Sequence, residues 1–251
     1  MATAVQPHRR FCIIDSSALL PFYIKTAAKS DRAQARISKI IEAVRHHHVD
    51  VQLFVPNIVV AEVFAALDRH CYSTWEKQIN NKYGGVGRAL DKRKYRSARD
   101  RFRRDIHNGA LLYQLELNRY HILSLDLISP IDKSRKIYRT KNARSMGASD
   151  LLVGGMALHL AKIHGRENVA LLSTDARMKA VFEKQPTRLR PTTVKSLGLD
   201  GAAKSLGFGE WSGSIYPRVI DLHSCKDQEL ESFFRSWPLP TRKQRNRAPR
   251  A

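Results

Sequence analysis

Cysteine is scarce in this sequence of 251 residues, with three copies spread along the chain. Cys12, Cys71 and Cys225 form neither a metal-ligand spacing nor the even set of a disulfide framework, which predicts a cytoplasmic protein in a reducing compartment. No apolar run approaches the roughly 18 residues needed to cross a membrane. The apolar stretch 11–24 is interrupted by an acid and a proline and lacks a cleavage pattern, so we expect no signal peptide and no membrane partner.

Several common catalytic arrangements are also missing. No Ser/His/Asp or Cys/His arrangement is evident, which argues against a side-chain nucleophile. The glycines at positions 84, 85 and 87 are not followed by Lys and then Ser or Thr, so they predict a flexible break and not a phosphate-binding loop. The adjacent histidines at 46–48 are more typical of a solvated patch than of a metal site.

Acidic residues are outnumbered by basic ones, with 23 Asp and Glu against 44 Lys and Arg and a formal net charge of +21. Such an excess says little about the fold, but it predicts a polyanionic partner. We find no basic amphipathic helix with a strong apolar face, so RNA or DNA is favoured over a membrane surface. The hydrophobic content of 43% is that of a globular chain with a substantial core.

A basic run occupies residues 88–104, where nine basic residues stand against two acidic ones. Tyr95, Phe102 and Ile106 recur at spacings of seven and four, which predicts a helix with a narrow apolar seam that continues, after a break, into residues 111–118. Most such runs are solvated helix faces, but the aromatic interleaving and the overall charge make RNA contact an equal alternative. The candidate RNA-binding residues are Arg88, Lys92, Arg93, Lys94, Arg96, Arg99 and Arg103.

The order of apolar segments predicts an α/β fold with a central parallel sheet. The expected strands are residues 11–15, 51–55, 121–126, 169–172 and 218–222. The expected helices include residues 30–45, 58–69, 131–138 and 176–183, together with a buried helix near the start of segment 147–178. Gly154 and Gly155, inside that buried helix, predict close packing against a neighbouring element.

Four carboxylates stand at the ends of these elements. Asp15 follows the first strand, and Glu62 lies one turn into the helix after the second. Asp150 opens the buried helix, and Asp175 follows the strand after it. In a parallel sheet with right-handed crossovers, all four can converge on one edge. Carboxylates gathered without basic partners would repel one another, and a divalent cation such as Mg²⁺ or Mn²⁺ would resolve that repulsion.

Each acid also has an ordinary structural explanation. Asp15 and Asp175 could cap the helices that follow them. Asp150, in the first turn of its helix, could interact favourably with the helix dipole. Glu62 interrupts an apolar run and is costly there unless it is exposed or neutralised. Asp126 and Asp132 are candidate accessory acids, for which capping is the simpler explanation.

Four segments resemble the signature segments of PIN-domain proteins, which include the endoribonuclease toxins of bacterial toxin–antitoxin pairs. They are IIDSSALLPFY (13–23), VPNIVVAEVFAAL (55–67), ASDLLVGGMAL (148–158) and LLSTDARM (171–178). The resemblance implies a three-layer α/β/α fold and metal-dependent phosphodiester hydrolysis, mostly of RNA. By similarity, the catalytic and metal-binding acids would be Asp15, Glu62, Asp150 and Asp175, and Ser17 and Ser173 would be hydroxyls that orient them.

The resemblance therefore predicts an endoribonuclease that uses Mg²⁺ or Mn²⁺, with RNA as substrate and with an antitoxin protein and a second copy of the chain as candidate partners. The alternative is a non-catalytic RNA- or DNA-binding protein on the same scaffold. A haloacid-dehalogenase-type phosphatase would need a second Asp two residues after the first, where this chain has Ser17.

This chain is longer than the compact toxins of the PIN family. A basic helical insert at about 71–110 and an extension after residue 185 have no counterpart in the resemblance. We expect a PIN-like nuclease domain over residues 1–222, with a loop-rich segment at 186–213. Residues 223–251 are expected to form a basic C-terminal tail that is partly disordered.

Overall fold

The centre of the protein is a five-stranded parallel sheet with the strand order β3-β2-β1-β4-β5. The structure is a computed structural model, and it describes residues 9–24, 30–68, 92–107, 111–137, 145–235 and 237. The strands are β1 (Arg10–Ile14), β2 (Val51–Pro56), β3 (Leu112–Leu115), β4 (Val169–Ser173) and β5 (Arg218–Asp221). The α/β fold with a central parallel sheet that the sequence predicts is confirmed.

β1 and β4 lie side by side in the middle of the sheet. Their register pairs Phe11 with Val169 and Ile14 with Leu172. Every residue of β4 is buried, as expected of a parallel strand that is covered on both faces. Because both strands run in the same direction, the residues that follow them emerge at one edge of the sheet, where open α/β folds place their sites.

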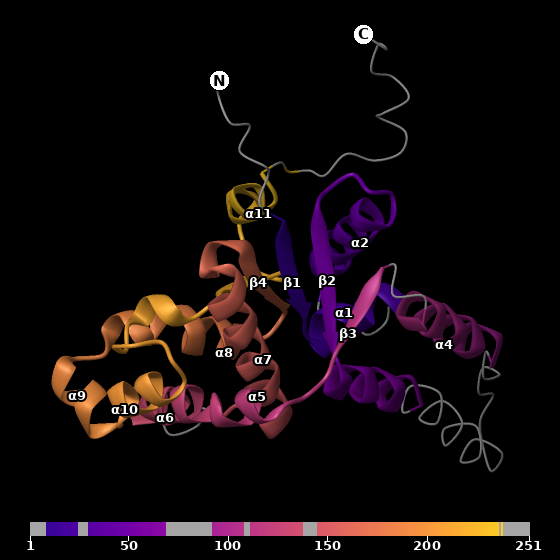
Figure 1. The fold of residues 1–251 in the computed structure, drawn as a ribbon. Helices are drawn as coiled ribbons and strands as arrows, with labels where there is room; N and C mark the ends of the chain where they lie inside the picture. Colours follow the sequence, from indigo (N-terminus) through magenta and orange to yellow (C-terminus); the bar gives the residue numbers. More distant parts are fainter. Residues whose placement is uncertain are drawn as a thin grey trace, which may run out of the picture.

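Helices lie on both sides of this sheet. Figure 1 shows α1 (Ser16–Tyr23) and α2 (Asp31–Arg45) on one side and α7 (Ala148–His164) on the other. The handedness of the crossovers explains why the helices divide between the two faces. The chain moves across the sheet in one direction from β1 through β2 to β3, and it returns in the opposite direction from β3 to β4. Because each crossover is right-handed, the two directions place their helices on opposite faces. The other helices are residues 57–68, α4 (Lys92–His107), α5 (Arg119–Leu123), α6 (Leu125–Ile137), α8 (Ala176–Lys179), α9 (Pro191–Ser196), α10 (Leu199–Ser205) and α11 (Asp227–Phe234).

Two predictions about the middle of the chain are wrong. Residues 111–118, expected to continue the basic helix, contain β3, an edge strand in which one residue of four, Leu112, is buried. Residues 121–126, expected to form a strand, belong to α5 and α6. The side chain of Asn118 accepts a hydrogen bond from the His121 N–H (3.1 Å) and so starts α5 as an N-cap. A short apolar run such as 121–126 is compatible with a strand and with a helix. A segment with one buried position, such as β3, shows no hydrophobic periodicity from which its structure could be predicted.

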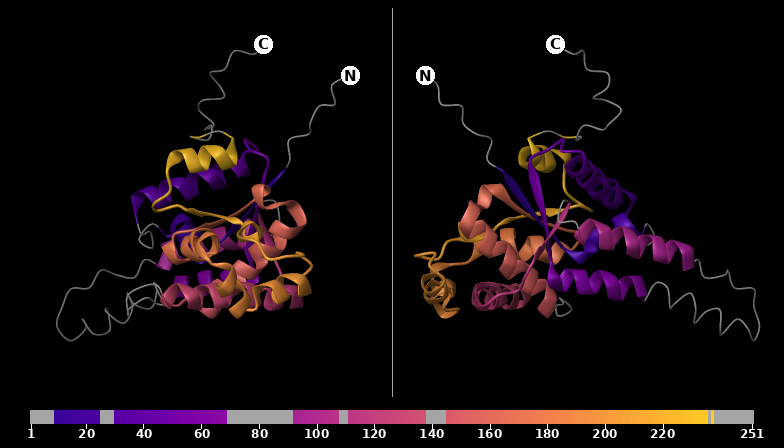
Figure 2. Two further views of the ribbon diagram at one scale, coloured as in Figure 1. Left: turned by 90° about the vertical axis from the view of Figure 1, so that its left-hand side faces the viewer. Right: turned by 45° about the vertical axis from the view of Figure 1, so that its right-hand side comes forward.

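The C-terminal part of the chain is more ordered than the sequence predicts. The segment 186–213, expected to be loop, contains α9 and α10, and Pro191 takes the first position of α9, where proline favours a helix start. α11 lies within the expected tail and beside α2 (Figure 2). The buried Arg36 guanidinium fixes it by donating to Leu222 O (3.1 Å) and to Asp227 Oδ1 (2.5 Å). The end of the tail is outside the described residues, and the domain limits stay a prediction.

The described cysteines, Cys12 and Cys225, are buried free thiols, and Cys71 falls outside the described residues. Their burial among apolar side chains makes them small core residues. Among the helices that the structure describes, none combines the length and the apolar character needed to cross a membrane.

The two glycines of α7 are sites of close packing, as predicted. A Cβ atom on Gly155 would lie 2.5 Å from the carbonyl oxygen of His121 in α5. A Cβ atom on Gly154 would lie 2.4 Å from the ring of Phe182. The contact at Gly155 is the less adaptable of the two, because a backbone oxygen cannot rotate away as a side chain can.

We predict that Gly155→Ala lowers the free energy of unfolding by about 1–3 kcal/mol, because the added methyl group overpacks the α5–α7 contact. Gly201→Ala is the matched control in α10, where no described atom would lie within 4 Å of the new Cβ. That change should raise stability by up to about 1 kcal/mol through helix propensity. Urea denaturation measures both, and equal effects of the two substitutions would contradict the packing argument.

Candidate active site

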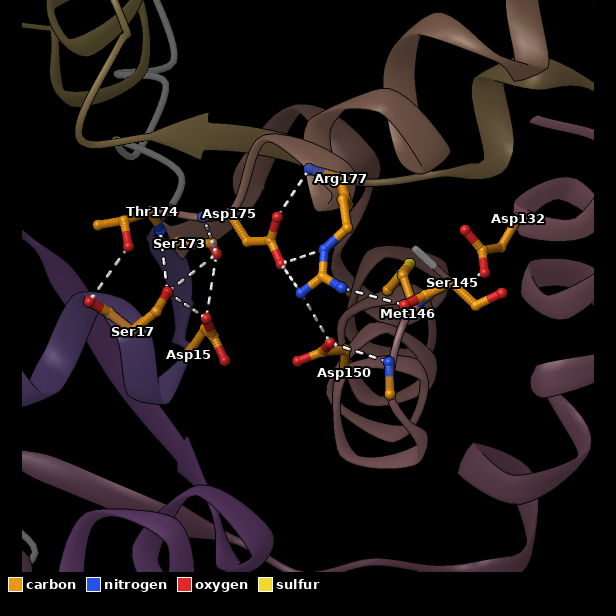
Figure 3. A network of polar contacts seen from close by, with 11 residues as sticks. Asp15, Ser17, Asp132, Ser145, Met146, Asp150, Ser173, Thr174, Asp175 and Arg177 are labelled. Carbon is orange, nitrogen blue, oxygen red and sulfur yellow. Dashed lines mark hydrogen bonds and ion pairs between the residues drawn. The ribbon is translucent and has the colours of Figure 1, made fainter. Parts of the chain in front are cut away.

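Asp15 is the most deeply buried of the four predicted acids, with 3% of its surface exposed. Its backbone N–H donates to Leu172 O of β4 (2.9 Å), which fixes it between the two central strands. It occupies the N-cap position of α1, but in the described chain its side chain makes no capping hydrogen bond. Instead, Oδ2 accepts hydrogen bonds from the hydroxyls of Ser17 (2.5 Å) and Ser173 (3.0 Å) (Figure 3). The capping explanation is therefore wrong for Asp15.

The two serine hydroxyls form one network with the chain that follows β4. Their oxygens lie 3.3 Å apart. Ser17 Oγ accepts from the Thr174 N–H (3.0 Å), and Ser173 Oγ accepts from the Asp175 N–H (3.0 Å). The start of α1 and the end of β4 are thus held together around the Asp15 carboxylate. These are contacts expected of residues that orient an acid, although that role stays a prediction.

Asp175 is the N-cap residue of α8, and Asp150 lies in the first turn of α7, whose N-cap residue is Gly147. Asp175 Oδ1 accepts from the Arg177 N–H (2.9 Å) at the start of α8. Asp150 Oδ2 accepts from the Gly147 N–H (3.1 Å) at the start of α7. The ordinary structural explanation therefore holds for these two acids. It does not exclude a second role, because a carboxylate has two oxygens and several lone pairs.

Glu62 reaches the site from the helix at residues 57–68. Val59 and Val63 of that helix are fully buried, whereas Glu62 is half-buried. The helix therefore turns its apolar face into the core and keeps the carboxylate partly in contact with solvent. This placement avoids the cost of a fully buried, unpaired charge.

The charges of these acids act on one another. Burial raises the pKa of Asp15; two serine hydroxyls lower it, and the charges of Asp150 and Glu62 raise it again. Burial likewise raises the pKa of Asp150; the Gly147 N–H and Arg177 lower it, and Asp175 and Glu62 add to the rise. The four acids that the sequence singles out are therefore linked electrostatically, although they come from four different elements.

Arg177 is a candidate functional residue that the sequence analysis does not single out. Its Nε donates to Asp175 Oδ2 (2.7 Å), its Nη2 donates to the same oxygen, and Nη2 lies 3.7 Å from Asp150 Oδ2 (Figure 3). Its Nη1 donates to Ser145 O (3.0 Å). Asp150 and Asp175 thus do have a basic partner. One feature of the sequence could have indicated this role: Arg177 comes two residues after Asp175 at a helix start, a spacing that lets the arginine side chain fold back onto the carboxylate.

Asp132 lies on the far side of Arg177 from Asp15 (Figure 3). It is buried in α6, and its Oδ2 accepts from the Met146 N–H (2.9 Å) just before α7. The hydrogen bond with Asp175 raises the pKa of Arg177, and the charges of Asp150 and Asp132 add to that effect. Asp132 is therefore not a helix cap; its carboxylate holds the segment that leads into α7 by accepting a hydrogen bond from that segment's backbone. Asp126 is exposed in the first turn of α6.

The four acids suit a hard divalent cation in kind, because carboxylate oxygens are the ligands that Mg²⁺ and Mn²⁺ prefer. The mutual repulsion at Asp15 and Asp150 is the situation that such an ion relieves. The positions of the four side chains, however, are not those of a formed metal site. Within the described parts of the chain, no group of three or more His, Cys, Asp or Glu side chains is placed to hold an ion. Arg177 lies between two of the four acids, where an ion would compete with it.

Helix α4 carries the predicted RNA-binding residues that the structure describes. Arg96 and Arg103 are exposed, and Arg99 is half-buried. The predicted apolar seam is confirmed at Phe102 and Ile106, which are buried. The side chains of Arg88, Lys92, Arg93 and Lys94 lie outside the described residues.

One arginine of the basic run turns inward. The Arg101 guanidinium donates to Phe22 O at the end of α1 and lies over the rings of Phe22 (4.4 Å) and Tyr23 (4.9 Å). Its cation therefore compensates carbonyl groups at a helix C-terminus and packs on two aromatic faces. Arg101 attaches α4 to the rest of the protein and does not belong to the exposed basic face.

Comparison with known proteins gives little further information. No family model matches the chain, and no curated protein matches it. Among solved structures, the chain is similar to one chain in the crystal structure of VapBC2 from Rickettsia felis bound to a DNA fragment from their promoter. The two are 12% identical with a TM-score of 0.40, over 68% of this chain and 92% of that chain. A likeness of this degree carries no argument about activity.

Proposed function

We propose that this chain is a divalent-metal-dependent endoribonuclease whose metal ligands are Asp15, Glu62, Asp150 and Asp175. One observation carries the proposal: four carboxylates from separate elements come together at the carboxyl edge of a parallel sheet, where Asp150 and Glu62 raise the pKa of Asp15, and Asp175 and Glu62 raise that of Asp150. The PIN-domain resemblance of the four segments implies the same residues and the same chemistry.

The chain's own residues would prepare the site in three ways. Ser17 and Ser173 hold one oxygen of Asp15 in place, so this acid is fixed before any ligand arrives. Asp150 and Asp175 are held at helix starts by backbone N–H groups. Glu62, which is also partly exposed, would orient the ion or the attacking water. Mg²⁺ or Mn²⁺, when bound, supplies Lewis acidity, which activates water and neutralises charge on the phosphate.

The charge distribution favours a nucleic acid as the substrate, and the PIN-domain resemblance implies RNA. The chain carries a formal net charge of +21, and exposed arginines of α4 extend that charge over one helix face. Phosphate contacts of this kind bring a nucleic acid to a site without reading its sequence. The antitoxin partner and the homodimer that the resemblance implies stay predictions.

A non-catalytic RNA- or DNA-binding protein on the same scaffold is the second candidate. The observation that favours it is the position of Arg177, which already compensates two of the four acids. Incubation of the purified protein with total RNA, with Mn²⁺ or with a chelator, distinguishes the two functions. New RNA ends that appear with Mn²⁺ alone support the nuclease, whereas binding without cleavage under both conditions supports the alternative.

We predict that Asp15→Asn abolishes Mn²⁺-dependent RNA cleavage and leaves RNA affinity within about twofold, because phosphate contacts and not this buried acid supply binding. Cleavage is measured on labelled RNA and affinity by filter binding. Asp200→Asn, at an exposed position of α10, is the matched control and should cleave normally. Unchanged cleavage by Asp15→Asn would refute the metal-ligand assignment.

The same substitution should stabilise the metal-free protein at neutral pH. The pKa of Asp15 is raised above its ordinary value of 3.8, so the folded state binds this proton more tightly than the unfolded state does. The stability that the neutral carboxyl contributes is therefore fully present below that ordinary value, and it is lost as the pH rises through the raised pKa. In a chelator, Asp15→Asn should melt above the parent at pH 7.5, and the difference should shrink toward pH 4. A lower melting temperature than the parent at pH 7.5 would contradict this reasoning.

The role of α4 is testable through salt dependence. Replacing Arg96, Arg99 and Arg103 together by Gln should reduce the slope of log affinity against log salt by about 2 for single-stranded RNA, because three phosphate contacts are lost. The control replaces Arg188, Arg190 and Lys195, three exposed basic residues near α9, and should change the slope less. A slope equal to that of the parent would remove α4 from the RNA interface.

A further inference from the structure

We propose that Arg177 is a resident counter-cation of the acid cluster, and that its guanidinium must leave Asp150 and Asp175 before a divalent ion can bind there. Arg177 would thereby set the metal affinity of the site. This inference rests on the proposed function, because it presumes that the cluster binds Mg²⁺ or Mn²⁺. It concerns a residue for which neither the sequence pattern nor the resemblance gives a role.

The first argument is the position of the guanidinium. Two of its nitrogens donate to Asp175 Oδ2, and one of these, Nη2, also lies 3.7 Å from Asp150 Oδ2. A single planar cation therefore bridges two of the four predicted ligands, which Figure 3 shows side by side. The third contact, from Nη1 to Ser145 O (3.0 Å), holds the plane in this orientation.

The second argument is competition for the same oxygen atoms. A divalent ion would take carboxylate oxygens that Arg177 now uses as hydrogen-bond acceptors. The two cations would also repel each other at such short separations. Since no three acids of the described chain are placed to hold an ion at present, displacement of Arg177 is the rearrangement that would make Asp150 and Asp175 available.

The third argument is that the Arg177 side chain is partly exposed to solvent, whereas Asp15 is buried. Its side chain is 35% exposed, although its backbone lies in α8, which continues into a π-helical turn at Ala180–Lys184. A long, partly solvated arginine can exchange its carboxylate partners for water at small cost. Asp15, by contrast, is buried and held by two hydroxyls, so it would serve as the fixed ligand around which the other acids rearrange.

The experiment measures Mn²⁺ binding by isothermal titration calorimetry to the full-length protein and to Arg177→Gln, after removal of metals. We expect Arg177→Gln to bind Mn²⁺ at least tenfold more tightly than the parent and to show a larger Mn²⁺-induced rise in melting temperature. Arg177→Lys keeps the charge and should return the affinity toward the parental value. Arg188→Ala, at an exposed position in the 3-10 turn Pro186–Arg188, is the control for a general loss of positive charge and should leave Mn²⁺ affinity unchanged.

The outcomes separate this inference from the proposed function. Equal or weaker Mn²⁺ binding by Arg177→Gln, with binding by the parent intact, overturns the counter-cation role and leaves the nuclease proposal standing. Absence of Mn²⁺ binding in the parent and in Arg177→Gln overturns both. Tighter binding by Arg188→Ala as well would assign the effect to overall charge and would also overturn the role of Arg177. Melting curves of each metal-free variant verify that it is folded before titration.

Discussion

The parallel pairing of β1 with β4 is the constraint on which the candidate site depends. It aligns Ile14 with Leu172, so the chain leaves both strands at the same level. The Asp15 N–H continues the ladder by donating to Leu172 O, and Ser173 is thereby brought to the Asp15 carboxylate. A shift of this register by one residue would turn Ser173 to the opposite face of the sheet and remove its hydroxyl from Asp15.

The site compensates its crowded acids in two different ways. Asp15 is buried and relies on neutral hydroxyl donors, which hold the carboxylate without cancelling its charge. Asp150 and Asp175 are less buried and share a full positive charge from Arg177.

The basic helix α4 is attached to the core by a small number of side chains. Phe102 is fully buried, and Asp105 accepts hydrogen bonds from the hydroxyl of Tyr23 (2.8 Å) and from Arg45 (3.2 Å). Together with Arg101 on the aromatic rings of α1, these contacts fix which side of α4 faces inward. Arg96, Arg103 and Arg104 keep their charge in solvent, where phosphate groups can reach it. Attachment thus uses other residues of the charged run than those that we propose to contact nucleic acid.

The sequence by itself determined the parts of this protein that depend on long or strongly patterned segments. The apolar segments of β1, β2, β4 and β5 predict strands, and the acids that follow these elements or open the helices after them identify the candidate site. The edge strand β3 and helix α5 could not be predicted in this way, because one buried residue or a short apolar run carries no period. Only the tertiary structure brought Arg177 to Asp150, turned Arg101 inward and left Arg96 and Arg103 exposed. Such contacts join residues far apart in the chain, and local patterns contain no information about which of them will meet.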